Sequence, residues 1–118
     1  IGTRFIATRE ANAPDEYKQM IVSSKAADIV YTPVFTGVHG SYLRGSIENA
    51  GLDPDNLPDV DKSAMDFASS AKSDAKAWRD IWGAGQGVGT IDDIRPAYDV
   101  VMRMEQEYRE TLSKLSAR

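Results

Sequence analysis

The sequence predicts a mostly helical α/β chain whose one or two short strands do not make a complete sheet. Its 118 residues are 42% hydrophobic, which is enough for one domain and too apolar for a disordered chain. Helical spacing of apolar residues covers more of the chain than the alternation of apolar and polar residues that is typical of strands. Because one strand is not stable alone, we expect residues 1–118 to be part of a larger α/β domain.

Charge and the missing cysteines exclude several function classes. A net charge of −4 argues against general binding to nucleic acids or anionic membrane surfaces, which needs clustered Lys and Arg. Without Cys there are no disulfides, thiolate metal ligands or Cys nucleophiles, which fits a cytoplasmic location. No apolar run approaches the ~20 residues that span a bilayer, and the N-terminus lacks the layout of a signal peptide.

The first two elements are predicted to be a strand and a helix. Residues 1–7 contain the β-branched and aromatic side chains typical of a strand, whose open edge needs a partner such as a preceding barrel segment. Pro14 suits the first turn of a helix, and Asp15 and Glu16 suit its positive end. We therefore expect a helix over residues 14–24.

The middle of the chain alternates between short elements and a long loop. Residues 27–32 read as a second strand that Pro33 ends. Ser41 is a candidate cap for a short helix through Asn49, with Gly51 as its stop. Asp, Asn, Ser and Lys then predominate over residues 52–73, which predicts a long loop of functional or mobile character.

Two helices are expected in the last third of the chain. Asp74 is a candidate cap for a helix that ends before Gly83, and Thr90 with Asp93 has the spacing of a capping box. The second helix is predicted over residues 91–116. Its apolar positions recur at helical spacing: Ile94, Tyr98, Val101, Met104, Tyr108, Leu112 and Leu115. Such a stripe fits either a dimer interface or packing against the helix's own barrel.

A glycine-rich stretch over residues 83–89 is the most conspicuous motif. It does not match a dinucleotide-binding fingerprint, because Val88 occupies the third glycine position and a predicted helix, not a strand, precedes it. The stretch leads into a predicted capped helix, so its N–H groups could meet an anion or a flavin edge. The alternative is a flexible connector between helices.

The remaining candidates favour structural roles. His39 is the single histidine and lies in a glycine-punctuated loop, so we expect a surface residue rather than a metal ligand or catalytic base. Trp78 and Trp82 share a helical face and are expected to pack in a core or interface. Asp92 and Asp93 point apart on a helix, so capping explains them better than an acidic dyad.

Gly2 and Thr3 form a further candidate site. Barrel enzymes commonly bind phosphate through backbone N–H groups in the loops after their last strands, and glycine permits the close approach.

Several segments together resemble the C-terminal part of the nitronate monooxygenases, also called 2-nitropropane dioxygenases. The most specific motifs are G-T-R-F over residues 2–5 and W-G-A-G-Q over residues 82–86; residues 28–32 and Tyr17-Lys18 add to them. The similarity covers essentially the whole chain. The related flavin-dependent enoyl-ACP reductases share the barrel design and the first motif.

The resemblance implies the C-terminal fragment of a TIM (β/α)8 barrel that begins at the eighth strand and binds FMN. It implies that the backbone of Ile1, Gly2 and Thr3 holds the FMN phosphate, and that Gly85, Gln86 and Gly87 close over the flavin. The implied activity is oxidation of an alkyl nitronate with O₂. No catalytic residue of the family maps onto this chain, because the family's histidine and second phosphate segment lie upstream.

Three functions stay open from the sequence. The first is the nitronate-oxidising enzyme, for which residues 1–118 alone should bind FMN weakly and not turn over. The second is an enoyl-ACP reductase-like enzyme that uses a nicotinamide donor. The third is a helical interaction module, which would unfold cooperatively in isolation because a domain buries its own core.

Overall fold

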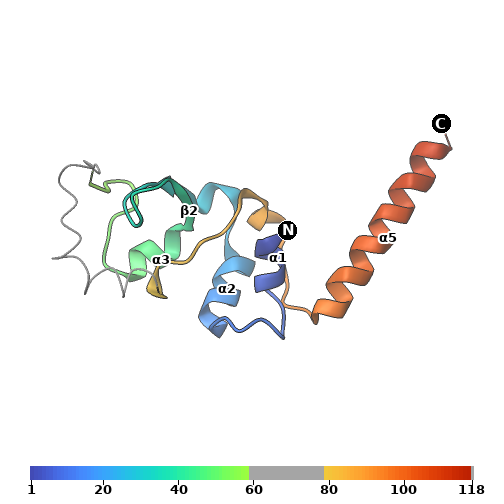
Figure 1. Cartoon of the computed structure of the whole chain (residues 1–118), viewed down its shortest axis with the longest axis horizontal. Helices are drawn as coiled ribbons and strands as arrows, with labels where there is room; N and C mark the ends of the chain where they lie inside the picture. Colours follow the sequence, from blue (N-terminus) through green and yellow to red (C-terminus); the bar gives the residue numbers. More distant parts are fainter. Residues whose placement is uncertain (59–78, 118) are drawn as a thin grey trace.

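The computed structural model describes residues 1–58 and 79–117 as short helices, one two-stranded sheet and a long terminal helix (Figure 1). In chain order the elements are α1 (Gly2–Ile6), α2 (Asp15–Ser23), η1 (Ala26–Asp28), β1 (Ile29–Thr32), β2 (Gly40–Leu43), α3 (Arg44–Asn49), η2 (Gln86–Thr90) and α5 (Ala97–Ser116). The expectation of a mostly helical chain with one or two short strands is confirmed.

The two strands pair antiparallel, with Ile29 opposite Leu43 and Thr32 opposite Gly40. A further segment joins the sheet beyond β2: the Leu43 N–H donates to the Trp82 carbonyl at 2.8 Å, and the Ala84 N–H donates to the Ser41 carbonyl at 3.2 Å. Strands of a TIM barrel run parallel, so β1 and β2 are not neighbouring strands of a barrel wall.

The core lies where α1, α2, the sheet and the glycine-rich stretch meet. Its buried members are Ala7, Ile21, Leu43, Ala84, Val88 and Ile91. At its edge the rings of Tyr17 and Trp82 stack, with centroids 4.9 Å apart and planes 2° from parallel. Stacked aromatic pairs add to the stability that their burial gives, so the packing role expected for Trp82 is confirmed.

The opening segment is a helix, and its prediction as the eighth strand is wrong. Residues 2–6 form α1, in which the Arg4 N–H donates to the Ile1 carbonyl at 3.0 Å. Within the described residues no strand lies beside residues 1–7, so a helix satisfies their backbone groups locally. A single parallel bridge, between Thr8 and Arg95, follows α1.

The short helix after the sheet begins later than predicted. Ser41 belongs to β2 and not to a helix cap, because its carbonyl is bonded to Ala84. Helix α3 therefore starts at Arg44. Gly51 has φ +85°, the left-handed conformation that ends helices, as expected.

The terminal helix begins at Ala97 and not near residue 91. A proline disfavours helical backbone in the residue before it, so Pro96 fixes the start of α5. The Glu10 carboxylate accepts a 2.6 Å hydrogen bond from the Ala97 N–H, which places a negative charge at the positive end of the helix. The capping box predicted for Thr90 and Asp93 is therefore wrong.

Part of the sequence prediction falls outside the described residues. These include Trp78 and most of the loop predicted over 52–73 and of the helix predicted from Asp74. Residues 52–58 contain no helix or strand, and Trp82 lies beyond the helical residues 79–80. Trp82 therefore does not end a helix; its carbonyl is bonded to β2.

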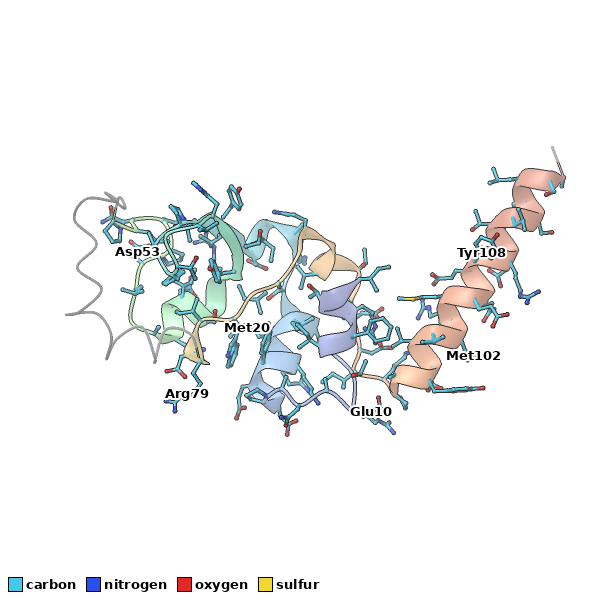
Figure 2. All side chains as sticks on the ribbon, in the orientation of Figure 1. Glu10, Met20, Asp53, Arg79, Met102 and Tyr108 are labelled. Carbon is cyan, nitrogen blue, oxygen red and sulfur yellow. The ribbon has the colours of Figure 1, made fainter. Side chains whose placement is uncertain are left out.

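Helix α5 stands apart from the other elements, and the molecule measures 59 × 31 × 20 Å (Figure 1). Figure 2 shows its side chains, including Met102 and Tyr108, on a helix that lies apart from the other described elements along most of its length. Its exposed apolar residues are Tyr98, Val101, Met102, Tyr108, Leu112 and Leu115. Among the helices of residues 1–58 and 79–117, none has the length and apolar character needed to cross a membrane.

Candidate functional site

A cleft of about 460 Å³ lies between α1, η2 and the first turns of α5. Four of the six residues expected to bind the cofactor line it: Ile1, Thr3, Gly85 and Gly87. Gly2 and Gln86 are their exposed neighbours and do not line the cleft themselves. The volume falls within the range of small-molecule sites.

A direct hydrogen bond joins the two predicted segments. The Gly85 N–H donates to Thr3 Oγ1 at 2.9 Å, across 82 positions of sequence. Gly85 precedes the first residue of η2, and its carbonyl accepts the first hydrogen bond of that turn from the Val88 N–H at 3.1 Å. The start of η2 is thus fixed against the start of α1.

Backbone donors are available on both sides of this contact. The amides of Gly2 and Thr3 precede the first helical hydrogen bond of α1, where N–H groups lack a partner within the helix. A Cβ added at Gly2 or Gly87 would meet nothing within 4 Å, so the backbone there is open to a ligand. These are the features that binding a phosphate or a ring edge through the backbone requires.

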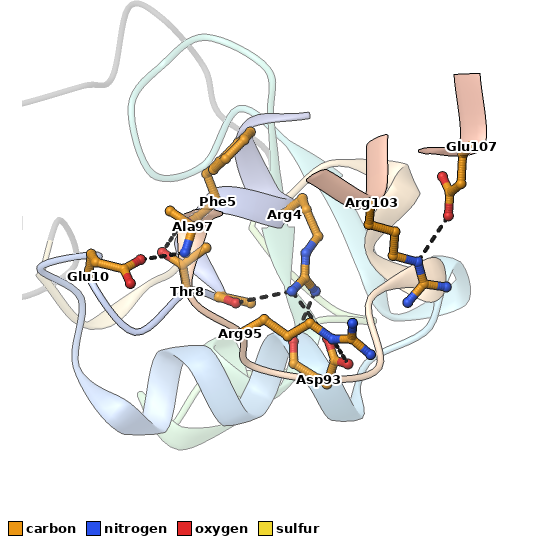
Figure 3. A network of polar contacts seen from close by, with 10 residues as sticks. Arg4, Phe5, Thr8, Glu10, Asp93, Arg95, Ala97, Arg103 and Glu107 are labelled. Carbon is orange, nitrogen blue, oxygen red and sulfur yellow. Dashed lines mark hydrogen bonds and ion pairs between the residues drawn. The ribbon is translucent and has the colours of Figure 1, made fainter. Parts of the chain in front are cut away.

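Figure 3 shows an ion-pair network whose members Arg4, Asp93 and Arg95 line the cleft. Arg4 Nη1 donates to the Asp93 carbonyl at 2.9 Å, and Arg4 Nη2 donates to Asp93 Oδ1 at 3.2 Å. Arg95 donates to the other carboxylate oxygen of Asp93. The hydrogen bond from Arg95 lowers the pKa of the Asp93 carboxyl below its ordinary value, with the charge of Arg4 acting in the same direction.

Among the described residues, the side-chain charges that line the cleft balance. Three are cationic and three are anionic: Arg4, Arg95, Arg103, Asp92, Asp93 and Glu107. Two of the cations are already paired with Asp93, and Arg103 donates to Glu107 at 3.0 Å. An anion bound here would therefore depend mainly on backbone N–H groups.

The glycine-rich stretch is anchored on both sides of Gly85. The Tyr17 hydroxyl donates to the Gly83 carbonyl, while Trp82 stacks on the Tyr17 ring. Partial burial raises the pKa of Tyr17, so it remains a donor at neutral pH. Val88 is completely buried in the core. Gln86 and Gly87, between these anchors, are held at the surface.

The network around Asp93 and the anchoring by Tyr17 were not predicted from the sequence. The sequence predicts a helix-capping role for Asp93, whereas the carboxylate binds two arginines. Arg4 lies in the G-T-R-F motif, directly after Gly2 and Thr3. A cationic side chain beside two predicted phosphate-binding residues was the available signal for the network. His39 is exposed as expected, with its ring centroid 4.8 Å from that of Tyr31.

No family model matches the chain. It is 27% identical over 127 aligned positions to a nitronate monooxygenase of Neurospora crassa, an alignment that covers 99% of this chain and 33% of that protein. The resemblance to nitronate monooxygenases is confirmed.

The structure is also similar to FabK of Thermotoga maritima. A point variant of FabK matches with a TM-score of 0.66 and 25% identity, over 98% of this chain and 35% of FabK. FabK itself matches with a TM-score of 0.68 and 24% identity, over 98% and 38%. The chain thus spans about a third of the length of the proteins it matches, and these likenesses support a flavin-dependent oxidoreductase family in general.

Proposed function

We propose that this chain forms part of an FMN-dependent TIM-barrel enzyme that oxidises alkyl nitronates with O₂. The proposal draws on the similarity to the Neurospora enzyme. The structural observation that carries it is the hydrogen bond between Thr3 and Gly85, since it joins the segment predicted to bind the phosphate to the segment predicted to contact the flavin.

In this proposal the backbone of Ile1, Gly2 and Thr3 binds the FMN phosphate, and Gly85, Gln86 and Gly87 lie against the flavin. The fit rests on the cleft volume and on the open backbone at Gly2 and Gly87. The bound flavin would accept the electrons of the nitronate carbanion and return them to O₂. Because the side-chain charges that line the cleft balance among the described residues, the side chains add no net positive charge, and the chain contributes mainly hydrogen-bond donors and shape.

The second candidate is an enoyl-ACP reductase-like enzyme, which the similarity to FabK favours. Both candidates use the same cleft for the flavin. They differ in the electron donor, which is the nitronate in the first and a nicotinamide in the second.

Oxygen uptake by a protein that contains this chain and the rest of the barrel, loaded with FMN, separates the two. We expect uptake to depend on an alkyl nitronate and to be insensitive to NADH. Rapid flavin reduction by NADH without nitronate-dependent uptake would replace the first candidate with the second.

A pair of valine variants tests the position of the site in the same assay. Gly87→Val places a branched side chain in the cleft without a clash inside the chain, so it should weaken FMN binding and lower oxygen uptake. Gln19→Val, on the exposed surface of α2, is the control and should leave both unchanged. Equal behaviour of the two variants would exclude the cleft as the flavin site.

A further inference from the structure

We infer that the Thr3 side chain is a positioning residue: its hydroxyl holds the segment 85–87 beside α1 and so sets the geometry of the cleft. This inference rests on the proposed function for the identity of the ligand. The hydrogen bond itself is a property of the chain alone.

At Gly85 the contact with α1 is a hydrogen bond from the backbone to a side chain. Gly85 is exposed and has no side chain of its own with which to contact α1. A Cβ built at Gly85 would lie 3.6 Å from Thr3 Oγ1, an ordinary van der Waals distance, so the two residues are in direct contact. The hydrogen bond to the Thr3 hydroxyl fixes the orientation of the Gly85 N–H relative to α1.

The anchors on either side do not replace it. Tyr17 fixes the Gly83 carbonyl, and burial fixes Val88. Gly85 lies between these points, and its N–H is satisfied by Thr3. Without that acceptor the Gly85 N–H loses its hydrogen bond, and the start of η2 is held only by the neighbouring contacts of Ala84 and Val88.

Thr3→Val and Thr3→Ser form a matched pair. Valine keeps the shape of threonine and removes the oxygen, whereas serine keeps the oxygen and removes the methyl group. A neutral hydrogen bond contributes roughly 1 kcal/mol, so valine should accelerate hydrogen exchange of the Gly85 amide roughly fivefold. Serine should restore the rate to within about twofold of wild type.

The experiment uses the 118-residue chain labelled with ¹⁵N. Amide exchange is measured first at Gly85 and at Leu43, whose N–H is bonded to Trp82 and reports that the fold is retained. FMN is then titrated into wild type and both variants, and the dissociation constants are read from amide shifts. We expect weakening of roughly fivefold for valine and little change for serine.

Three results are informative. Unchanged Gly85 exchange in Thr3→Val, or equal acceleration in both variants, would overturn the positioning role. If Gly85 exchange accelerates in Thr3→Val but all three proteins bind FMN equally well, the link between the Thr3 hydroxyl and cofactor binding would be overturned. If Gly85 exchange accelerates in Thr3→Val but the wild type does not bind FMN, the positioning role is supported and the proposed flavin function is contradicted.

Discussion

Asp93 illustrates how a single residue organises one side of the cleft. Its carboxylate and carbonyl accept from Arg4, which comes from α1, and its second carboxylate oxygen accepts from Arg95. The side chains of Arg4 and Asp93 are 17% and 34% exposed, so the pair is neither a surface ion pair nor a buried one. We assign it a modest contribution to stability, on the order of 1 kcal/mol.

Asp93→Asn should therefore lower the free energy of unfolding at pH 7 by about 1 kcal/mol. The folded carboxyl has a lowered pKa, so its contribution is present above the ordinary carboxyl pKa of about 4 and is lost as the pH falls through the lower folded value. Urea unfolding followed by tryptophan fluorescence measures the free energy of unfolding. The difference in this free energy between wild type and Asp93→Asn should shrink below pH about 4.

Asp92→Asn is the matched control, because Asp92 is the exposed neighbour of Asp93. The control should leave stability nearly unchanged at pH 7. A difference between wild type and Asp93→Asn that stays constant from pH 7 to pH 3 would show that the carboxylate charge does not act through the two arginines.

Among the elements, α2 follows directly from its sequence, whereas α1 and α5 do not. Pro14 and two acidic residues marked the start of α2 within one residue. Residues 1–7 have strand-like side chains, yet they lack a neighbouring strand among the described residues and form a helix instead. For α5 the capping signal at Thr90 was misleading, because Pro96 controls the backbone immediately before the helix.

The two predicted cofactor segments were identified from the resemblance, but their contact was not predictable from the sequence. A hydrogen bond across 82 positions depends on how α1 and η2 pack, and neither the threonine nor the glycine carries a local signal for it. The burial of Val88 was equally hidden, because the glycines around it suggest a mobile connector. Long-range packing, rather than local preference, decides this part of the site.

Leucines on two elements should respond differently to truncation. Leu43 in β2 is fully buried, so Leu43→Ala should cost roughly 2–5 kcal/mol of unfolding free energy. Leu112 in α5 is 50% exposed, so Leu112→Ala should change stability by less than about 0.5 kcal/mol. Chemical denaturation of the 118-residue chain measures both.

The pair of leucine variants also tests the separation of α5 from the core. If Leu112→Ala were as destabilising as Leu43→Ala, the α5 stripe would be packed against something in solution. If both substitutions lowered the free energy of unfolding only slightly, the core around Leu43 would contribute little to stability.

At the level of the whole molecule, the described residues form a cleft with two sets of backbone donors and balanced side-chain charges. The chain spans about a third of the length of the proteins it matches. This combination is consistent with the proposal that the chain contributes one side of a flavin site. It also explains why we expect residues 1–118 alone to bind FMN weakly, since the lining cations are already paired with carboxylates.

The most direct test is a titration of the ¹⁵N-labelled wild-type chain with FMN, with the amide shifts mapped onto the sequence. We expect weak, saturable binding whose largest shifts fall on Gly2, Thr3, Gly85, Gln86 and Gly87, with little change at Tyr31 in the sheet. Shifts that avoid these five amides, or no saturable binding at millimolar FMN, would contradict the proposal that the two segments form one flavin site.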